Sequence, residues 1–142
     1  MNGYLIDTNV LSELRRPVPA QSVIRWVSSR DPGALFLSVL TLGEIARGAE
    51  LLRIRDERAA RTLDAWTGEV RTRFAERILP VDGHVAECWA LLSPRQPLPV
   101  VDGLLAATAI VHRLTVVTRN AADFEPAGVP ILNPFLTGSV DQ

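Results

Sequence analysis

Lysine is absent from this sequence, and all 15 of its basic residues are arginine. The absence excludes sites that require a lysine amine, among them the P-loop phosphate clamp, the Schiff base and the lysine of a phosphoryl-accepting receiver site. The planar guanidinium groups that remain suit the recognition of phosphate and carboxylate. Arginine is therefore the basic residue through which this chain would bind such groups.

Cysteine and long apolar runs are scarce as well. Cys88 stands alone, which excludes a disulfide framework and a cysteine-rich metal site. No stretch approaches the roughly 20 apolar residues of a membrane span, and the start MNGYLIDTN lacks the basic n-region of a signal peptide. The formal net charge is -1, so no overall imbalance points to nucleic acid or membrane. These features predict a cytoplasmic protein that has no membrane partner.

The 142 residues are 47% hydrophobic, which is enough for one well-buried core. No internal repeat or linker appears, so residues 1–142 are expected to form a single domain. Short apolar runs alternate with segments of helical spacing, which favours an α/β domain with a parallel sheet. The predicted strands are 4–6, 35–39, 78–81, 115–118 and 129–132. The predicted helices are 8–15, 20–29, 41–52, 56–77, 83–92 and 102–114.

Four acidic residues stand at strand ends or helix starts of this pattern. Asp7 directly follows the first strand, and Glu44 lies in the opening turn of the helix after the second. Asp102 opens the apolar helix that contains LLAATAIV, and Asp123 lies in the turn TRNAADF. Functional groups of parallel sheets gather at the carboxyl ends of the strands, so the four acids are expected to lie together.

Each acid also has a purely structural explanation. Asp7 and Asp102 suit helix N-caps, Glu44 suits a helix dipole and Asp123 suits an Asx-turn. Taken jointly these explanations are weaker, because Ser or Thr would cap as well without bringing like charges together. Clustered carboxylates resist ionisation unless a cation is near, and hard divalent ions prefer oxygen ligands. The set therefore points to metal-assisted hydrolysis of a phosphoester.

Four segments carry a family resemblance: DTNVLSEL, SVLTLGEIARGAELL, VVDGLLAATAIVHRLTVVTRNAADF and VPILNP. In this order they resemble PIN-domain ribonucleases, and above all the VapC-like (FitB-like) toxins of bacterial type II toxin–antitoxin pairs. The resemblance spans residues 4–134. It implies a PIN-like fold, with a roughly five-stranded parallel sheet flanked by helices. It also implies an endoribonuclease that uses Mg²⁺, or Mn²⁺, together with an RNA substrate, a cognate antitoxin and a homodimer.

The resemblance assigns roles to the four acids. Asp7 and Asp102 would hold the principal ion. Glu44 would orient or deprotonate the attacking water. Asp123 would support a second ion, or the ligands of the first through water. All four acids of the pattern are present in this chain.

Polar and basic residues near the acids are candidates for substrate contacts. By the resemblance, Thr118 and Asn120 would support the site or touch the substrate. Arg47 follows Glu44 by three residues and so shares its helix face, and our hypothesis is that it holds an RNA phosphate. Three more arginines near this edge are candidates for the same role: Arg15, Arg16 and Arg119. The alternative is a solvated surface, or pairing with the acids themselves.

Two rival functions can be compared with this pattern. A haloacid-dehalogenase-like phosphatase needs a second Asp two residues after the first, and a lysine. Position 9 is Asn and lysine is absent, which argues against it. A non-catalytic, metal-binding interaction module with the PIN fold remains open, because intact acids are necessary for turnover but not sufficient.

Overall fold

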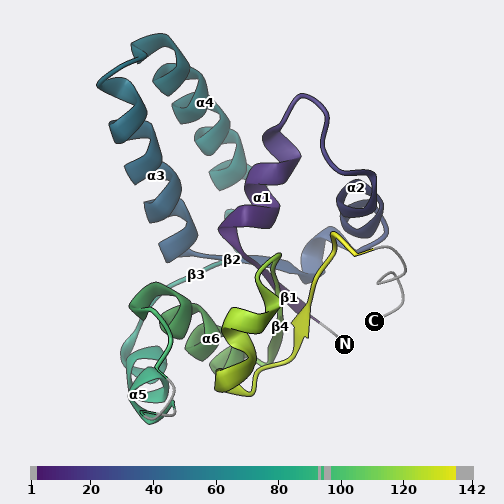
Figure 1. Ribbon diagram of the computed structural model, residues 1–142, viewed down its shortest axis with the longest axis vertical. Helices are drawn as coiled ribbons and strands as arrows, with labels where there is room; N and C mark the ends of the chain where they lie inside the picture. Colours follow the sequence, from purple (N-terminus) through teal and green to yellow (C-terminus); the bar gives the residue numbers. More distant parts are fainter. Residues whose placement is uncertain (1–2, 93, 95–96, 137–142) are drawn as a thin grey trace.

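The chain folds around one parallel sheet, as predicted. The computed structural model describes residues 3–92, 94 and 97–136. Five parallel strands are ordered β3-β2-β1-β4-β5, so the first strand lies at the centre (Figure 1). The strands are β1 (Gly3–Ile6), β2 (Leu35–Ser38), β3 (Ile78–Leu79), β4 (Leu114–Val117) and β5 (Ile131–Leu132).

Helices follow or connect these strands throughout the described residues. The α-helices are α1 (Thr8–Arg15), α2 (Gln21–Ser28), α3 (Val39–Arg53), α4 (Glu57–Arg73), α5 (Gly83–Leu91), α6 (Val100–His112) and α7 (Ala121–Phe124). Two 3-10 turns, η1 (Pro32–Ala34) and η2 (Glu125–Ala127), precede β2 and follow α7. None of the helices in the described part of the chain has the length and hydropathy of a transmembrane segment.

Two helices begin earlier than the sequence predicts, which changes the position of two acids. Strand β2 ends at Ser38, whose hydroxyl accepts the N–H of Leu40 and caps α3. Glu44 therefore lies in the second turn of α3 rather than in its opening turn. Helix α6 begins at Val100, so Asp102 is its third residue and not its N-cap. Asp123 likewise lies inside the short helix α7.

The sheet is buried on both faces, as parallel sheets usually are. Side chains alternate along β1: Tyr4 and Ile6 pack into a cluster that includes Trp26, and Leu5 packs into a second cluster with Leu105 of α6. The Tyr4 and Trp26 rings meet edge to face, 5.0 Å between centroids. This packing fixes β1, and with it the residue that follows the strand.

Helices α3 and α4 form a long hairpin that extends away from the sheet (Figure 1). Near its tip, the Arg53 guanidinium donates to Glu50 at 2.8 Å and to Asp64 at 2.9 Å, which joins the two helices. Helices α5 and α6 pack together elsewhere on the molecule. The base of α3 lies beside the start of α1, where the Thr8 hydroxyl donates to Glu44 at 2.6 Å.

Glu13 holds the start of α2. The residue lies on α1 and is buried, with 5% of it exposed. Its carboxylate accepts the N–H of Ala20 at 2.8 Å and pairs with Arg16 at 3.3 Å. The Ala20 hydrogen bond is the main reason that the pKa of Glu13 lies below its usual value, with Arg16 adding to the effect. Glu13 therefore acts as a cap supplied from outside the helix.

Candidate active site

Asp7 lies where β1 leaves the sheet, and 8% of it is exposed. Its N–H donates to the Val117 carbonyl at 2.9 Å, which continues the pairing of β1 with β4. One carboxylate oxygen accepts the N–H of Thr8 at 2.7 Å, and the other accepts the hydroxyl of Thr118 at 2.9 Å. Asp7 thus caps α1, as its structural explanation predicts, and is also oriented by a residue 111 positions away.

Thr118 connects the ends of β1 and β4. It is fully buried, and its hydroxyl oxygen accepts the N–H of Asn120 at 3.0 Å and the side-chain amide of Asn9 at 3.3 Å. The same amide of Asn9 reaches Asp7 at 3.4 Å, and its carbonyl oxygen accepts the N–H of Arg119 at 3.1 Å. We did not predict this role of Asn9 from the sequence, although its place in the DTN motif could have indicated it.

Glu44 projects from α3 toward the start of α1. It is exposed, and its carboxylate accepts the hydroxyl of Thr8 at 2.6 Å. Thr8 therefore joins the carboxylates of Asp7 and Glu44, through its N–H and its hydroxyl respectively. In the sequence, only the position of Thr8 next to Asp7 indicates that it would join these two acids.

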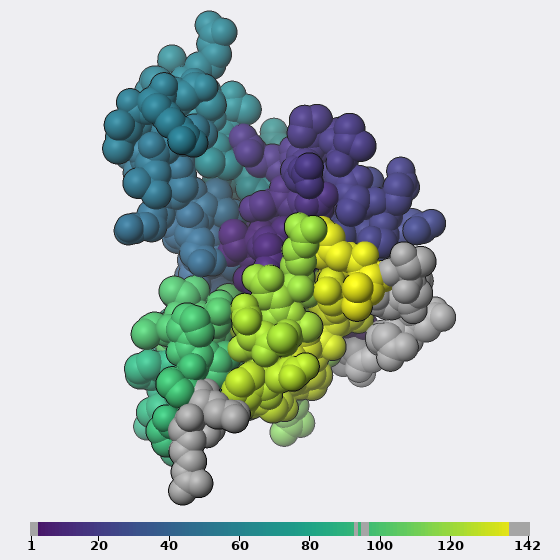
Figure 2. Space-filling view, viewed as in Figure 1, coloured from purple at the N-terminus to yellow at the C-terminus, as the bar shows by residue number. Residues whose placement is uncertain are grey.

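Asp102 and Asp123 complete the group of four acids. The pKa of Asp102 is raised by burial first, and then by the charges of Asp7, Asp123 and Glu44. Burial also raises the pKa of Asp7, against the lowering effect of its hydrogen bonds, and Glu44 adds to the rise. The segments that carry these acids converge near the middle of the molecule (Figures 1 and 2). The charges of the other three acids therefore all act on Asp102.

The donor set fits a hard divalent cation that keeps part of its water shell. Within the described residues, none of the four acids forms an ion pair with an arginine, so their mutual repulsion has no protein counter-charge at close range. The same residues contain no group of three or more His, Cys, Asp or Glu side chains that could hold a metal by themselves. Mg²⁺ commonly binds through one or two carboxylates and retains several waters, which suits both observations.

The remaining candidates lie around this group on exposed positions. Asn120 is exposed at the start of α7, and its contact to the site is the N–H that it donates to Thr118. Arg47 is exposed on α3, one helical turn beyond Glu44. Arg119 is exposed directly after Thr118.

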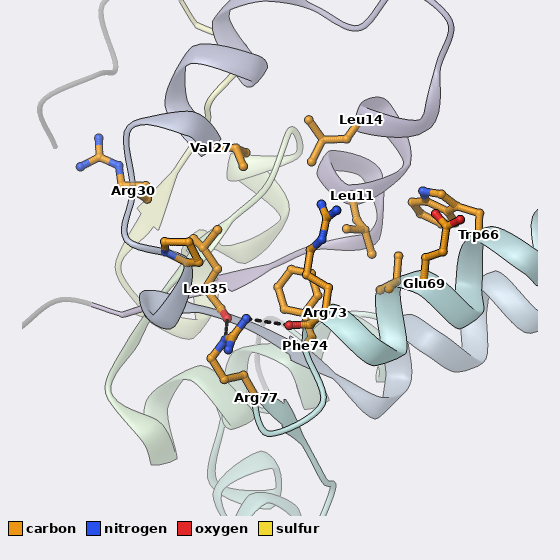
Figure 3. A pocket seen from close by; sticks show the side chains of 12 residues that line it. Leu11, Leu14, Val27, Arg30, Leu35, Trp66, Glu69, Arg73, Phe74 and Arg77 are labelled. Carbon is orange, nitrogen blue, oxygen red and sulfur yellow. Dashed lines mark hydrogen bonds between the residues drawn. The ribbon is translucent and has the colours of Figure 1, made fainter.

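An apolar pocket of about 340 Å³ lies apart from the carboxylates, between α1, α2 and α4 (Figure 3). None of the four acids lines it. Arg30, Arg73, Arg77 and Glu69 supply its charged groups. Its apolar walls include Leu11, Leu14, Val27, Leu35, Trp66 and Phe74. This pocket is a second surface feature with a different chemistry.

Comparison with known proteins places the chain in a family. The PIN domain matches residues 4–127. The chain is 32% identical to "VapC ribonuclease Y4jK" of Sinorhizobium fredii, over 92% of this chain and 96% of that protein. It is 35% identical to "Toxin FitB" of Neisseria gonorrhoeae, over 92% of this chain and 97% of that protein.

Solved structures agree with this placement. FitAB bound to an IR36 DNA fragment superposes with a TM-score of 0.86 at 34% identity, covering 94% of this chain and 96% of that one. A toxin–antitoxin complex from Klebsiella pneumoniae superposes with a TM-score of 0.66 at 27% identity, covering 93% and 98%. The chain therefore belongs to the PIN-domain family, in the group of VapC-like and FitB-like proteins.

Proposed function

We propose that this protein is a metal-dependent endoribonuclease and the toxin of a toxin–antitoxin pair. The observation that carries the proposal is the group of four acids at the carboxyl edge of the sheet. The charges of Asp7, Asp123 and Glu44 all act on Asp102, and in the described residues none of the four pairs with an arginine. Two relatives support it by name, one as a ribonuclease and one as a toxin. The name ribonuclease indicates RNA as the substrate, and the four acids indicate hydrolysis of its phosphodiester bonds.

Asp7 and Asp102 would hold the ion, and Mg²⁺ or Mn²⁺ fits their oxygen ligands. Such an ion would lower the pKa of a bound water and offset negative charge on the phosphate. The Thr118 hydroxyl fixes the orientation of Asp7 by donating to it at 2.9 Å. Glu44 would accept the proton of the attacking water while the Thr8 hydroxyl holds its carboxylate at 2.6 Å. Asp123 is exposed and would act on the ion through water.

Cleavage of a labelled single-stranded RNA tests the proposal directly. The wild type is expected to cut with Mg²⁺ and to stop when a chelator is added. Asp7→Asn and Asp102→Asn are expected to lose about 100-fold or more in rate, because each removes a charged ligand of the ion, and losing even an outer partner of a metal ligand costs about 10–100-fold. Asp82→Asn is the matched control, since Asp82 caps α5 through Val85 and is not one of the four acids. Cleavage that survives in both site variants would contradict the proposal.

A non-catalytic metal-binding interaction module is the alternative. It would use the same four acids, because intact acids are necessary for turnover but not sufficient. This module would bind Mg²⁺ or Mn²⁺ and never cut RNA. A metal-dependent rise in melting temperature without any cleavage would therefore select it over the nuclease.

We also propose a cognate antitoxin and a homodimer as the assembly state. The structural relative from Klebsiella pneumoniae is a toxin–antitoxin complex, which supports the first. The pocket in Figure 3 suits a partner segment that carries apolar side chains beside an acidic one, because Arg73 borders its apolar walls without an ion pair in the described residues. Light scattering after size-exclusion chromatography measures the dimer.

A variant of the pocket tests the partner contact. Leu14→Glu is expected to abolish co-purification with the protein that the neighbouring gene encodes. It is expected to leave RNA cleavage by the isolated protein unchanged. Leu51→Glu is the control, since Leu51 is exposed on α3 and does not line the pocket. Equal co-purification of both variants would remove the pocket from the interface.

A further inference from the structure

Arg119 is held at the edge of the carboxylate site by contacts on both sides of its backbone. Its N–H donates to the side-chain oxygen of Asn9 at 3.1 Å, and its carbonyl accepts the side-chain amide of Asn133 at 3.3 Å. Asn9 in turn donates to Asp7 at 3.4 Å. One side chain therefore separates the backbone of Arg119 from the first acid of the site.

The guanidinium of Arg119 is held as well. It lies over the ring of Phe135, 4.4 Å from the ring centre, which is within the range of a cation–π contact. Phe135 has its own supports: its N–H donates to Asn133 at 2.9 Å, and its carbonyl accepts the Ser22 hydroxyl at 3.2 Å. The ring limits the rotamers of a long side chain, so less freedom is lost when that side chain binds a ligand.

The charge of Arg119 remains available to a ligand. The side chain is exposed, and in the described residues it forms no ion pair, although its charge also acts on Glu13. Arg16 is already paired with Glu13 at 3.3 Å. Arg15 lies over the ring of Trp66, 5.9 Å from its centre, and Trp66 lines the pocket of Figure 3. Among these three neighbours, Arg119 combines a fixed position beside Asp7 with an unpaired guanidinium.

We propose that Arg119 binds a backbone phosphate of single-stranded RNA and so positions the strand against Asp7. The inference rests on the proposed function and names a positioning residue for it. A guanidinium matches the oxygens of a phosphate with two parallel N–H donors, and the phenyl ring beneath it leaves its edge free to donate. A positive charge here also offsets the repulsion that four carboxylates exert on a polyanion.

The test measures how tightly a labelled, 12-nucleotide single-stranded RNA binds at several KCl concentrations, in chelator so that metal-dependent cleavage does not interfere. Losing one phosphate contact makes the slope of log affinity against log salt shallower by about 0.7. Arg119→Ala is expected to show that change and about a tenfold loss of affinity at low salt. Arg119→Lys keeps the charge and should keep the slope. Phe135→Leu should weaken binding and leave the slope unchanged.

Arg113→Ala is the matched control, because Arg113 is an exposed arginine at the opposite end of the same strand β4. It is expected to leave both affinity and slope at wild-type values. An unchanged slope in Arg119→Ala, or a wild type that binds no RNA, overturns the phosphate contact. In the first case the guanidinium is free to serve a protein partner instead. RNA that binds through Arg119 but is not cut with Mg²⁺ contradicts the proposed function alone, so the two failures are distinct.

Discussion

Replacing Thr118 by valine tests how the site is held together. The substitution keeps the shape of the side chain and removes a hydroxyl that is fully buried and donates to the Asp7 carboxylate at 2.9 Å. A hydrogen bond to a charged group contributes about 1.5–3 kcal/mol to stability. The variant also removes the acceptor of the Asn120 N–H and of the Asn9 side-chain amide. Asn120 is exposed, so water can replace its bond, and the Asn9 amide still reaches Asp7 at 3.4 Å. We therefore expect Thr118→Val to lower the free energy of unfolding by about 2–3 kcal/mol.

The measurement is thermal unfolding at pH 7.5 in chelator, followed by circular dichroism. For a chain of this length, 1 kcal/mol corresponds to about 3 °C, so the melting temperature should fall by about 6–9 °C. Thr118→Ser is the control: it keeps the hydroxyl and loses one methyl group, which costs about 1 kcal/mol. A valine variant that melts within 1 °C of the wild type, or above the serine variant, would refute the reasoning.

The loss in Thr118→Val should also depend on pH. The hydroxyl favours the charged form of Asp7, so the stabilisation that it gives is present above the pKa of Asp7 and declines as the pH falls through that pKa. Burial raises the pKa of Asp7, so the decline begins at a higher pH than for an exposed aspartate. The melting curves of variant and wild type should therefore approach one another in acid.

Three further predictions concern stability. Burial is the main reason that the pKa of Asp102 is raised, so the stability of the fold falls as the pH rises through that pKa. Without metal, the Asp102→Asn variant should therefore melt above the wild type at pH 7.5 and at the same temperature in acid. The hydrogen bond from a backbone N–H is the main reason that the pKa of Glu13 is lowered. The stabilisation by Glu13 is therefore complete above its pKa in the unfolded chain and is lost as the pH falls through its pKa in the folded protein. The Glu13→Gln variant should melt below the wild type at pH 7.5 but not in acid. The new methyl group of Gly48→Ala in α3 would meet open space, so this variant should gain about 0.5–1 kcal/mol in the free energy of unfolding, measured in urea. The new methyl group of Gly103→Ala would lie 2.9 Å from the Trp89 ring, so that variant should lose about 1–3 kcal/mol.

The fold and the choice of acids could be predicted because they depend on patterns that extend along the chain. The alternation of apolar runs with segments of helical spacing predicts the parallel sheet. The position of Asp7 directly after the first strand predicts that the site lies at the carboxyl edge of that sheet. Helix boundaries were predicted less well. Ser38 caps α3 from within the predicted strand, and α6 begins after Pro99 without a side-chain cap, so both Glu44 and Asp102 were placed too close to a helix start.

The contacts that orient the acids could not be predicted from the sequence. Thr8 and Asn9 are small polar residues beside a helix start, where many local hydrogen bonds satisfy them equally well. Their actual partners, Glu44 and Thr118, are 36 and 109 positions away, and only the closed sheet brings them within reach. Glu13 is a similar case, because a glutamate inside a polar helix gives no sign that it will cap the next one.

The central place of β1 has a consequence for synthesis. Strand β4, which flanks β1 on one side, and Thr118, which orients Asp7, are translated more than one hundred positions after Asp7. A polypeptide that stops before residue 118 lacks that threonine and β5 altogether. Such a shortened product could not orient Asp7 as the folded protein does, so the four acids reach their arrangement only after both Asp7 and Thr118 have been translated.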